Sequence, residues 1–431
     1  MLTKWRPFTS CHALVLIVSF VVIISTYITF SQGHDMYLGS FTEYNNDDVK
    51  YIRSAETLLQ HGIFTYHEPD VSTVFIMPGL PFVLAFCMKL FGYWGGIQAF
   101  RLVQILFLAG TIVLLYLFSR RLLNDRFGII VALLFALYIP NYVAANLILT
   151  EVLGQFFLWL FLYAGYLAVT RHSLPLFALA AASLSLGIYE RPNFALLPVV
   201  FLVYMLIHGY RVKQLIKPAL VVSGVVLLCM SPWWIRNAIV FHEFIPLTLS
   251  SGNPSLLGSQ LEWQYPPGAV EKFKDDFDKI ASATNRIDSD RFQKELAVKI
   301  RNYGFQTQPM AYLWQYTADR VNDMFKVPYY WKEIFGLKPH FVKTTHFVMI
   351  GIGILGFIMT LVMKVRRKDL SLLWLTALYF VVTALPFITF SRYGYFLMSF
   401  FIIYAAFAIH AFIPKAQLHS SRAKSSSSLH G

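Results

Sequence analysis

Two adjacent acids near the start of the chain are the residues best suited to chemistry. Asp47 and Asp48 lie in the stretch FTEYNNDDVKY, and Tyr51 follows Asp48 with the spacing D-x-x-Y. A carboxylate can accept a proton from a hydroxyl group, so either acid could act as a general base. The stretch follows one long apolar run and precedes a second hydrophobic region. Acids beside predicted membrane segments indicate a functional site.

Further ionisable residues lie at the ends of other apolar runs. They are Glu151 after Thr150, Glu190 with Arg191, Arg236 in the motif SPWWIRN, and Arg392 with Tyr393 after Ser391. Each alone has a structural explanation, because charged side chains at the ends of spans commonly reach the headgroups. Together, acids and arginines on one membrane face favour a site for an acceptor hydroxyl and an anionic phosphate, because Arg binds phosphate oxygens in a bidentate way.

The composition identifies the class of protein. Of the 431 residues, 57% are hydrophobic and 14% are charged, whereas a soluble domain carries roughly 25% charged residues. This deficit predicts a polytopic membrane protein. The net charge of +13 resides in short basic clusters between apolar runs, which indicates a positive-inside topology and not nucleic-acid binding. Cys11, Cys87 and Cys229 show no paired spacing, so neither a disulfide framework nor a CxxC metal site is predicted.

Ten apolar runs are predicted to span a bilayer, which takes roughly 17 to 25 residues each. They lie near 12–31, 98–119, 128–145, 152–170, 174–189, 194–208, 216–235, 345–363, 370–390 and 394–412. The segment 75–91 is also apolar but carries Pro78, Gly79 and Pro81 at its start. We interpret it as an interfacial or re-entrant helix. The first run is predicted to be a retained signal anchor.

This interpretation of 75–91 decides the predicted topology, because an eleventh span would reverse every later loop. With ten spans, the basic loop residues fall on one side, which the positive-inside rule makes cytoplasmic. They are Lys4, Arg6, Arg120, Arg121, Arg126, Arg171, Arg211, Lys213, Lys217, Lys364, Arg366, Arg367, Lys368, Lys415, Arg422 and Lys424. The opposite short turns carry almost only Arg191 and Arg392. We therefore predict a multi-pass cell-membrane protein with both termini cytoplasmic and an extracytoplasmic active site.

The sequence predicts one all-α membrane domain, residues 1–413, and a disordered cytoplasmic tail, 414–431. Two polar loops, about 32–97 and 236–344, fall on the outer side. The middle of the second loop is charged, and Phe292, Leu296, Val298 and Ile300 within it indicate a short amphipathic helix.

Five pieces of sequence, in this order, resemble one family. They are DDVKYIRSAETLLQHGIF, MPGLPFVLAFCMKLFG, LILTEVLGQFFLWL, SPWWIRNAIVFHEFIPLTLSSG and SRYGYFLMSFF. The chain, to about Phe412, is similar to membrane glycosyltransferases of the GT-C fold, in particular the group of dolichyl-phosphate-mannose protein mannosyltransferases and bacterial aminoarabinose lipid A transferases. It departs from the family in having MPGLP where a PPGYP-like pattern is usual, and in lacking the Asp-Glu pair of eukaryotic protein mannosyltransferases.

The resemblance implies transfer of a sugar from a polyprenyl-phosphate donor to an acceptor hydroxyl on the extracytoplasmic face. The D-x-x-Y spacing puts the family's catalytic acid on Asp48, with Asp47 as the alternative and Glu151 as the second outer-loop acid. We expect inverting displacement, in which the acid accepts the proton of the attacking hydroxyl. The expected partners are this donor, a lipid, glycan or protein acceptor, and the bilayer.

The resemblance also suggests which residues bind the donor phosphate. They would be found among Arg191, Arg236 and Arg392, and Tyr51 and Tyr393 are further substrate-binding candidates. No constellation of metal ligands is recognisable and no cofactor is required, although a divalent cation stays an open alternative.

Two other classes of protein compete with this interpretation. The same charges could line the route of a transporter or flippase for a polyprenyl-linked glycan, or the long outer loop could be the docking surface of a non-catalytic cell-envelope subunit. A route needs polar groups at membrane depth. The middles of most apolar runs hold Leu, Val, Ile and Phe, which favours the transferase.

Overall fold

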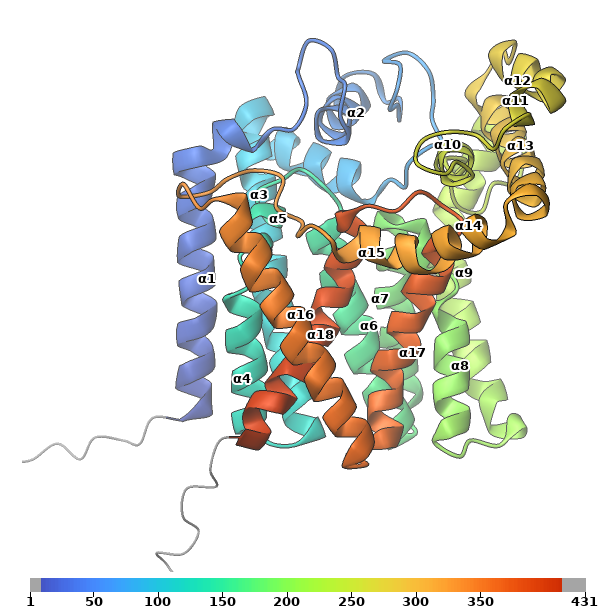
Figure 1. Ribbon diagram of the computed structural model, residues 1–431. Helices are drawn as coiled ribbons and strands as arrows, with labels where there is room; N and C mark the ends of the chain where they lie inside the picture. Colours follow the sequence, from blue (N-terminus) through green and yellow to red (C-terminus); the bar gives the residue numbers. More distant parts are fainter. Residues whose placement is uncertain (1–8, 413–431) are drawn as a thin grey trace, which may run out of the picture.

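The computed structural model describes residues 9–412, and within them the chain is helical (Figure 1). Apart from an isolated bridge between Leu261 and Gln264, these residues form no β structure. The helices of the bundle and of the first loop are α1 (Ser10–Gln32), α2 (Asp47–His61), α3 (Gly79–Leu122), α4 (Asp125–Ala136), α5 (Pro140–Ala144), α6 (Glu151–Arg171), α7 (Leu174–Glu190), α8 (Leu197–Ile207), α9 (Val212–Phe241), α16 (Pro339–Val362), α17 (Arg367–Ala384) and α18 (Ser391–Phe412). The predicted tail, 414–431, and Lys4, Arg6, Lys415, Arg422 and Lys424 lie outside the described residues.

Six helices of the described chain are long and apolar enough to cross a membrane: α1, α3, α6, α9, α16 and α18. Each of the ten predicted runs contains a helix, but α4, α7, α8 and α17 do not meet both requirements. The run 128–145 is divided because the chain leaves the helix after Ala136 and Pro140 begins α5. The all-helical, multi-pass prediction is therefore confirmed, whereas the number of ten spans is not.

The ambiguous segment 75–91 forms the first half of α3, which Gly92 interrupts. Gly92 has φ 74° and ψ 178°, a conformation open essentially to glycine alone. Beyond it the chain turns back closely, since a Cβ on Gly96 would lie 2.3 Å from the Cα of Met88. The half before Gly92 is about 20 Å long, short of the roughly 30 Å hydrocarbon core. This geometry fits the interfacial or re-entrant helix that the sequence predicts.

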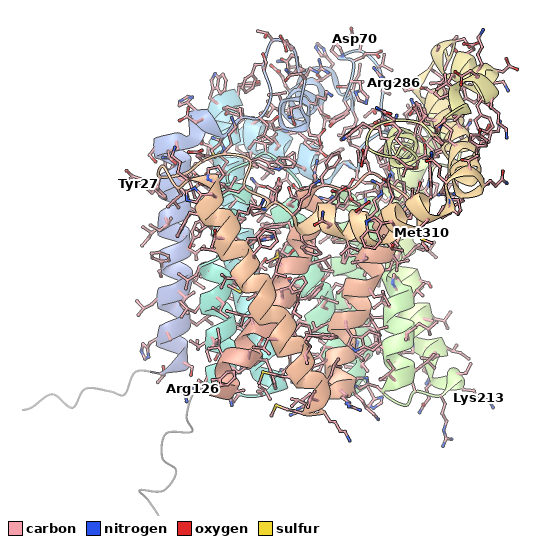
Figure 2. The ribbon with its side chains drawn as sticks, viewed as in Figure 1. Tyr27, Asp70, Arg126, Lys213, Arg286 and Met310 are labelled. Carbon is pink, nitrogen blue, oxygen red and sulfur yellow. The ribbon has the colours of Figure 1, made fainter. Side chains whose placement is uncertain are left out.

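The loops with many basic residues lie at one end of the bundle. Figure 2 places Arg126, at the start of α4, and Lys213, at the start of α9, at the lower end. The α16–α17 connection and the end of α18 lie at that end too (Figure 1). Asp70 and Arg286 lie at the opposite end (Figure 2). The two ends therefore separate the loops as the predicted topology requires.

The second long loop folds into a small helical unit at the upper end of the bundle (Figure 1). It contains α10 (Gly252–Gly258), α11 (Ala269–Lys272), α12 (Lys274–Ala281), α13 (Arg286–Thr307), α14 (Pro309–Trp314), a π-helical turn (Gln315–Asp319) and α15 (Arg320–Phe325). The predicted amphipathic helix is α13. Leu296 and Ile300 are buried against Leu256 in a core separate from that of the bundle, whereas Val298 is exposed.

Candidate active site

The acids of the first loop begin helix α2, which lies above the upper ends of the bundle helices (Figure 1). Asn46 is the N-cap residue, and its side chain accepts a hydrogen bond from the backbone N–H of Asp47 (2.7 Å). Acids in the first turn of a helix interact favourably with its dipole. This local sequence therefore fixes both carboxylates on one turn of helix, with their side chains in different surroundings.

Asp48 is fully buried and binds backbone of its own loop. Its carboxylate accepts hydrogen bonds from the N–H groups of Leu38 (2.6 Å) and Gly39 (3.2 Å). Burial raises the pKa of Asp48 above its usual value, against the opposing effect of these N–H donors. These hydrogen bonds link residues 38 and 39 to the first turn of α2. A base role for Asp48 stays an untested prediction.

Asp47 is half-buried and faces the bundle. Its Oδ1 accepts a hydrogen bond from the hydroxyl of Tyr66 (2.6 Å), and its Oδ2 pairs with Nη1 of Arg392 (2.8 Å). Burial tends to raise the pKa of Asp47, but the charge of Arg392 and the hydrogen bond from Tyr66 outweigh it and hold the pKa below its usual value. Asp47 is therefore ionised and in contact with the cationic part of the site.

Glu151, the first residue of α6, joins the two arginines. Its Oε1 accepts hydrogen bonds from Nε of Arg392 (2.8 Å) and Nη1 of Arg191 (2.7 Å), and Tyr329 donates to Oε2 (3.3 Å). The side chain of Glu151 is 0% exposed. A buried carboxylate needs such paired donors to stay charged. The result is a continuous chain of contacts from Asp47 through Arg392 and Glu151 to Arg191, which we call the acid–arginine cluster.

The cluster has room to bind an anion. Of the three guanidinium nitrogens of Arg191, only Nη1 donates to protein atoms among the described residues. In Arg392, Nε and Nη1 donate, and Nη2 has no hydrogen-bond partner among these residues. These N–H groups are available to oxygens of a ligand. The two side chains are 11% and 17% exposed. Partly buried guanidinium groups with free donors suit a phosphate.

The other predicted site residues occupy separate positions. Tyr51 is buried with its ring 5.6 Å from that of Tyr66, and burial, followed by the charge of Asp47, raises the pKa of Tyr51. Arg236 instead donates to the backbone oxygen of Thr73 (2.7 Å) and lies against aromatic rings, including that of Trp233. Tyr393 stacks on Phe390, and among the described residues its hydroxyl has no hydrogen bond to the cluster. The structure thus brings four of the eight predicted residues together in the cluster, and Tyr51 lies beside it.

An apolar cavity of about 390 Å³ lies near the cluster. Arg236 and Glu190 are its charged lining residues, and Phe82, Phe107 and Phe157 are among its aromatic ones. Glu190 is buried, and its Oε2 has no hydrogen-bond partner among the described residues. Glu190 precedes Arg191 in the chain, so this end of the cavity lies near the cluster, although none of the four cluster residues lines it.

Sequence reasoning missed Tyr66 and Tyr329, which donate to Asp47 and Glu151. Both tyrosines lie in loops with no recognisable motif, so only the folded chain reveals them. No group of three or more His, Cys, Asp or Glu side chains within residues 9–412 is arranged to hold a metal ion. The divalent cation left open by the sequence stays untested.

Comparison with known proteins supports the predicted resemblance. Residues 72–235 match the family described as dolichyl-phosphate-mannose-protein mannosyltransferase, which confirms the predicted kinship over this segment. No curated protein matches the chain by sequence.

Solved structures share its fold. The Archaeoglobus fulgidus oligosaccharyltransferase in its apo form superposes with a TM-score of 0.58 at 16% identity, covering 99% of this chain and 52% of that one. The archaeal oligosaccharyltransferase AglB from the same organism, with an inhibitory peptide and a dolichol-phosphate, gives 0.55 at 16% identity, covering 96% and 52%. This chain therefore spans about half the length of these proteins. ArnT from Cupriavidus metallidurans bound to undecaprenyl phosphate gives 0.43 at 15% identity, covering 92% and 77%, a score too low to support an argument.

Proposed function

We propose that the chain is a GT-C-type membrane glycosyltransferase that moves a sugar from a polyprenyl-phosphate donor to an acceptor hydroxyl. The match of residues 72–235 to the family and the shared fold support this proposal. The acid–arginine cluster is the observation that carries this proposal. It puts one half-buried, ionised carboxylate, Asp47, beside two arginines with free donors. A general base and a phosphate site are the two parts that such a transfer needs.

In the proposed reaction Asp47 is the base. The acceptor oxygen attacks the anomeric carbon while Asp47 accepts its proton, and the bond from that carbon to the phosphate oxygen breaks on the opposite side. The configuration at carbon is therefore inverted, and the phosphate leaves with the bonding electron pair. Arg191 and Arg392 stabilise the charge that develops on it. Glu151 is a positioning residue, since it holds both guanidinium groups.

The apolar cavity near the cluster is the proposed site for the first part of the polyprenyl chain. Phe82, Phe107 and Phe157 give it an apolar lining. With the lipid chain in this cavity, the phosphate at its end would lie near Arg191 and the rest of the cluster. Arg236 lies at this cavity and would line the path of the lipid without binding the reacting phosphate. The proposed working side is extracytoplasmic, because the basic loops lie at the end opposite the cluster.

A release assay tests the proposal. The full-length protein in lipid nanodiscs is given polyprenyl-phosphate sugars carrying different hexoses or pentoses, with an envelope lipid and glycan extract as acceptor, and free polyprenyl phosphate is measured. We expect release by the wild type and a loss of at least 100-fold in Asp47→Asn. A transporter or an assembly subunit would release none. The same assay with EDTA tests the divalent cation.

Asp48→Asn is the matched control for Asp47→Asn, since the two substitutions are isosteric and adjacent. We expect Asp48→Asn to speed amide hydrogen exchange at Leu38 and Gly39, whose N–H groups it binds, and to retain measurable release after correction for the folded fraction. If Asp48→Asn abolishes release while Asp47→Asn does not, the base is Asp48, as the D-x-x-Y spacing predicts.

A further inference from the structure

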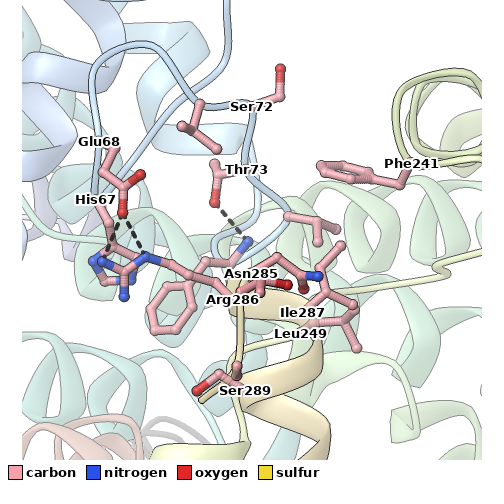
Figure 3. Close-up of a pocket in the computed structure, with 15 residues that line it drawn as sticks. His67, Glu68, Ser72, Thr73, Phe241, Leu249, Asn285, Arg286, Ile287 and Ser289 are labelled. Carbon is pink, nitrogen blue, oxygen red and sulfur yellow. Dashed lines mark hydrogen bonds and ion pairs between the residues drawn. The ribbon is translucent and has the colours of Figure 1, made fainter. Parts of the chain in front are cut away.

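A second cavity lies between the two outer loops, outside the acid–arginine cluster (Figure 3). Residues 67–75 of the first loop form one wall, and residues 283–289 at the start of α13 form the other. Its volume is about 550 Å³, within the range of roughly 300 to 1,000 Å³ typical of small-molecule sites. Nothing in the proposed transfer of the donor sugar uses this cavity.

The two walls are joined by an ion pair that leaves the cavity without an unpaired charge. Figure 3 shows Glu68 of the first loop facing Arg286 of α13, and Nε and Nη2 of Arg286 donate to Oε1 of Glu68 at 3.2 and 3.1 Å. Burial, followed by the charge of Arg286, lowers the pKa of His67 to about 4, so His67 is neutral at physiological pH. The one cation of the lining is held by Glu68, and Nη1 of Arg286, which has no hydrogen-bond partner among the described residues, can donate to a sugar oxygen. The cavity therefore suits a neutral ligand.

The lining combines hydroxyl groups with apolar faces. Ser72 and Thr284 contribute hydroxyls that have no hydrogen-bond partner among the described residues, and Nε2 of His67 is buried with none. Phe75 and Phe241 contribute aromatic rings. A sugar ring presents both hydroxyl groups and C–H faces, and so matches this mixture of hydrogen-bonding groups and aromatic surface better than an alkyl chain does.

One tyrosine connects this cavity to Asp47. The ring of Phe75 stacks on that of Tyr66 with centroids 5.5 Å apart, and the ring of His67 meets Tyr66 edge-on at 4.9 Å. Tyr66 in turn donates its hydroxyl to Asp47 (2.6 Å). The side chain of Tyr66 thus lies between the cavity wall and Asp47 and contacts both. A ligand in the cavity is adjacent to the reacting groups without covering them.

We propose that this cavity is an acceptor subsite that binds a neutral sugar next to the sugar or group whose hydroxyl reacts at Asp47. This inference rests on the proposed function, since it assigns the acceptor of that same reaction as a glycan. Binding a non-reacting sugar would hold the acceptor hydroxyl in position, and the binding energy would lower the barrier through orientation. Because Glu68 pairs with Arg286 in this lining, we expect a phosphate-bearing sugar to bind this subsite less well than a neutral one.

Filling the cavity tests the proposal. Ala283→Phe places a ring in the cavity wall, and Ala281→Phe, two residues earlier at the exposed end of α12, is the matched control. Val71→Trp fills the cavity from the opposite wall at a side chain that is already exposed. Each full-length variant in nanodiscs is applied to an array of neutral and phosphorylated oligosaccharides and of peptides, and thermal stability is measured in parallel.

We expect neutral oligosaccharides to bind, with a loss of at least 10-fold in Ala283→Phe and Val71→Trp and no change in Ala281→Phe. Equal binding by all variants, a preference for phosphorylated sugars or peptides, or no saccharide binding at all would overturn the proposal. If the filling substitutions weaken saccharide binding but the wild type releases no polyprenyl phosphate, the cavity is a sugar site and its role as acceptor subsite is overturned. Normal release with unchanged saccharide binding would leave the transferase intact and refute the subsite alone.

Discussion

Asp47 and Asp48 show how one residue step on a helix separates two chemical roles. Successive side chains point about 100° apart around the axis. Asp47 therefore reaches Arg392, while Asp48 reaches the N–H groups of Leu38 and Gly39. The carboxylate whose pKa is lowered, that of Asp47, is the one in contact with Arg392. It is also the more exposed of the two, so an acceptor hydroxyl could approach it.

Removing the hydroxyl of Tyr66 is expected to change the pH dependence of transfer. Tyr66→Phe removes a hydrogen bond that helps to lower the pKa of Asp47. The pKa then rises, and Asp47 becomes protonated, and so inactive as a base, at a higher pH. The acid limb of the profile of kcat/KM against pH should move upward, whereas Tyr393→Phe, outside the cluster, should leave it in place. A downward shift in Tyr66→Phe would contradict the role of Asp47.

Glu151 is expected to matter more for stability than Asp47 does. Glu151→Gln leaves Arg191 and Arg392 in a largely buried place without their shared carboxylate. Removing one partner of a buried ion pair costs about 3 to 5 kcal/mol. Asp47 is 39% exposed, so Asp47→Asn should cost much less. Thermal unfolding in detergent compares the two variants, and equal losses would show that Glu151 does not hold the cluster together.

The sequence predicted the charged members of the site because ionisable residues at the ends of apolar runs are recognisable one by one. The resemblance put Asp48 before Asp47, and only the folded chain shows that Asp47 is the acid that faces Arg392 of α18. Arg236 was grouped with the other arginines because it too ends an apolar run, yet it binds the backbone of Thr73. Tyr66 gave no signal at all, because its contact with Asp47 is made by a loop.

At the scale of the helices, Gly92 is the residue on which the shape of α3 depends. Its backbone conformation, with φ 74° and ψ 178°, is sterically unfavourable for residues that have a Cβ atom. Gly92→Ala should therefore cost about 1 to 3 kcal/mol, or straighten α3 and displace its first half. Gly224→Ala is the control, since nothing lies within 4 Å of the added Cβ within α9 and alanine favours a helix. Thermal unfolding and release activity should fall in Gly92→Ala alone.

The apolar pattern predicted where helices lie better than it predicted their length. Hydropathy averages over a window, so it did not register the break between Ala136 and Pro140. The same averaging joined 194–196 to the helix that begins at Leu197. For 75–91 the prolines and glycine were the informative residues, because they mark where α3 begins. The turn at Gly92 lies one residue beyond that segment.

For the whole molecule, the distribution of basic residues is the feature that assigns a side to each end. Arg126 and Lys213 lie at one end, and Asp70 and Arg286 lie at the other (Figure 2). Because lysines and arginines of short loops are retained in the cytoplasm, the first end should face the cytoplasm. The acid–arginine cluster and the proposed acceptor subsite then both lie on the extracytoplasmic side of the membrane. A lipid-linked donor suits this side, because the transfer then needs no nucleotide-linked sugar there.

Cysteine labelling of intact cells tests this orientation. In a background with Cys11, Cys87 and Cys229 replaced by alanine, Asp70→Cys should react with a membrane-impermeant maleimide, because Asp70 lies in an exposed part of the first loop. Lys213→Cys, at the exposed start of α9, should react only after the membrane is opened. The opposite pattern would put the cluster in the cytoplasm, and the donor would then have to present its sugar on that side. Labelling of both positions in intact cells would show mixed insertion, which the one-sided distribution of basic residues does not allow.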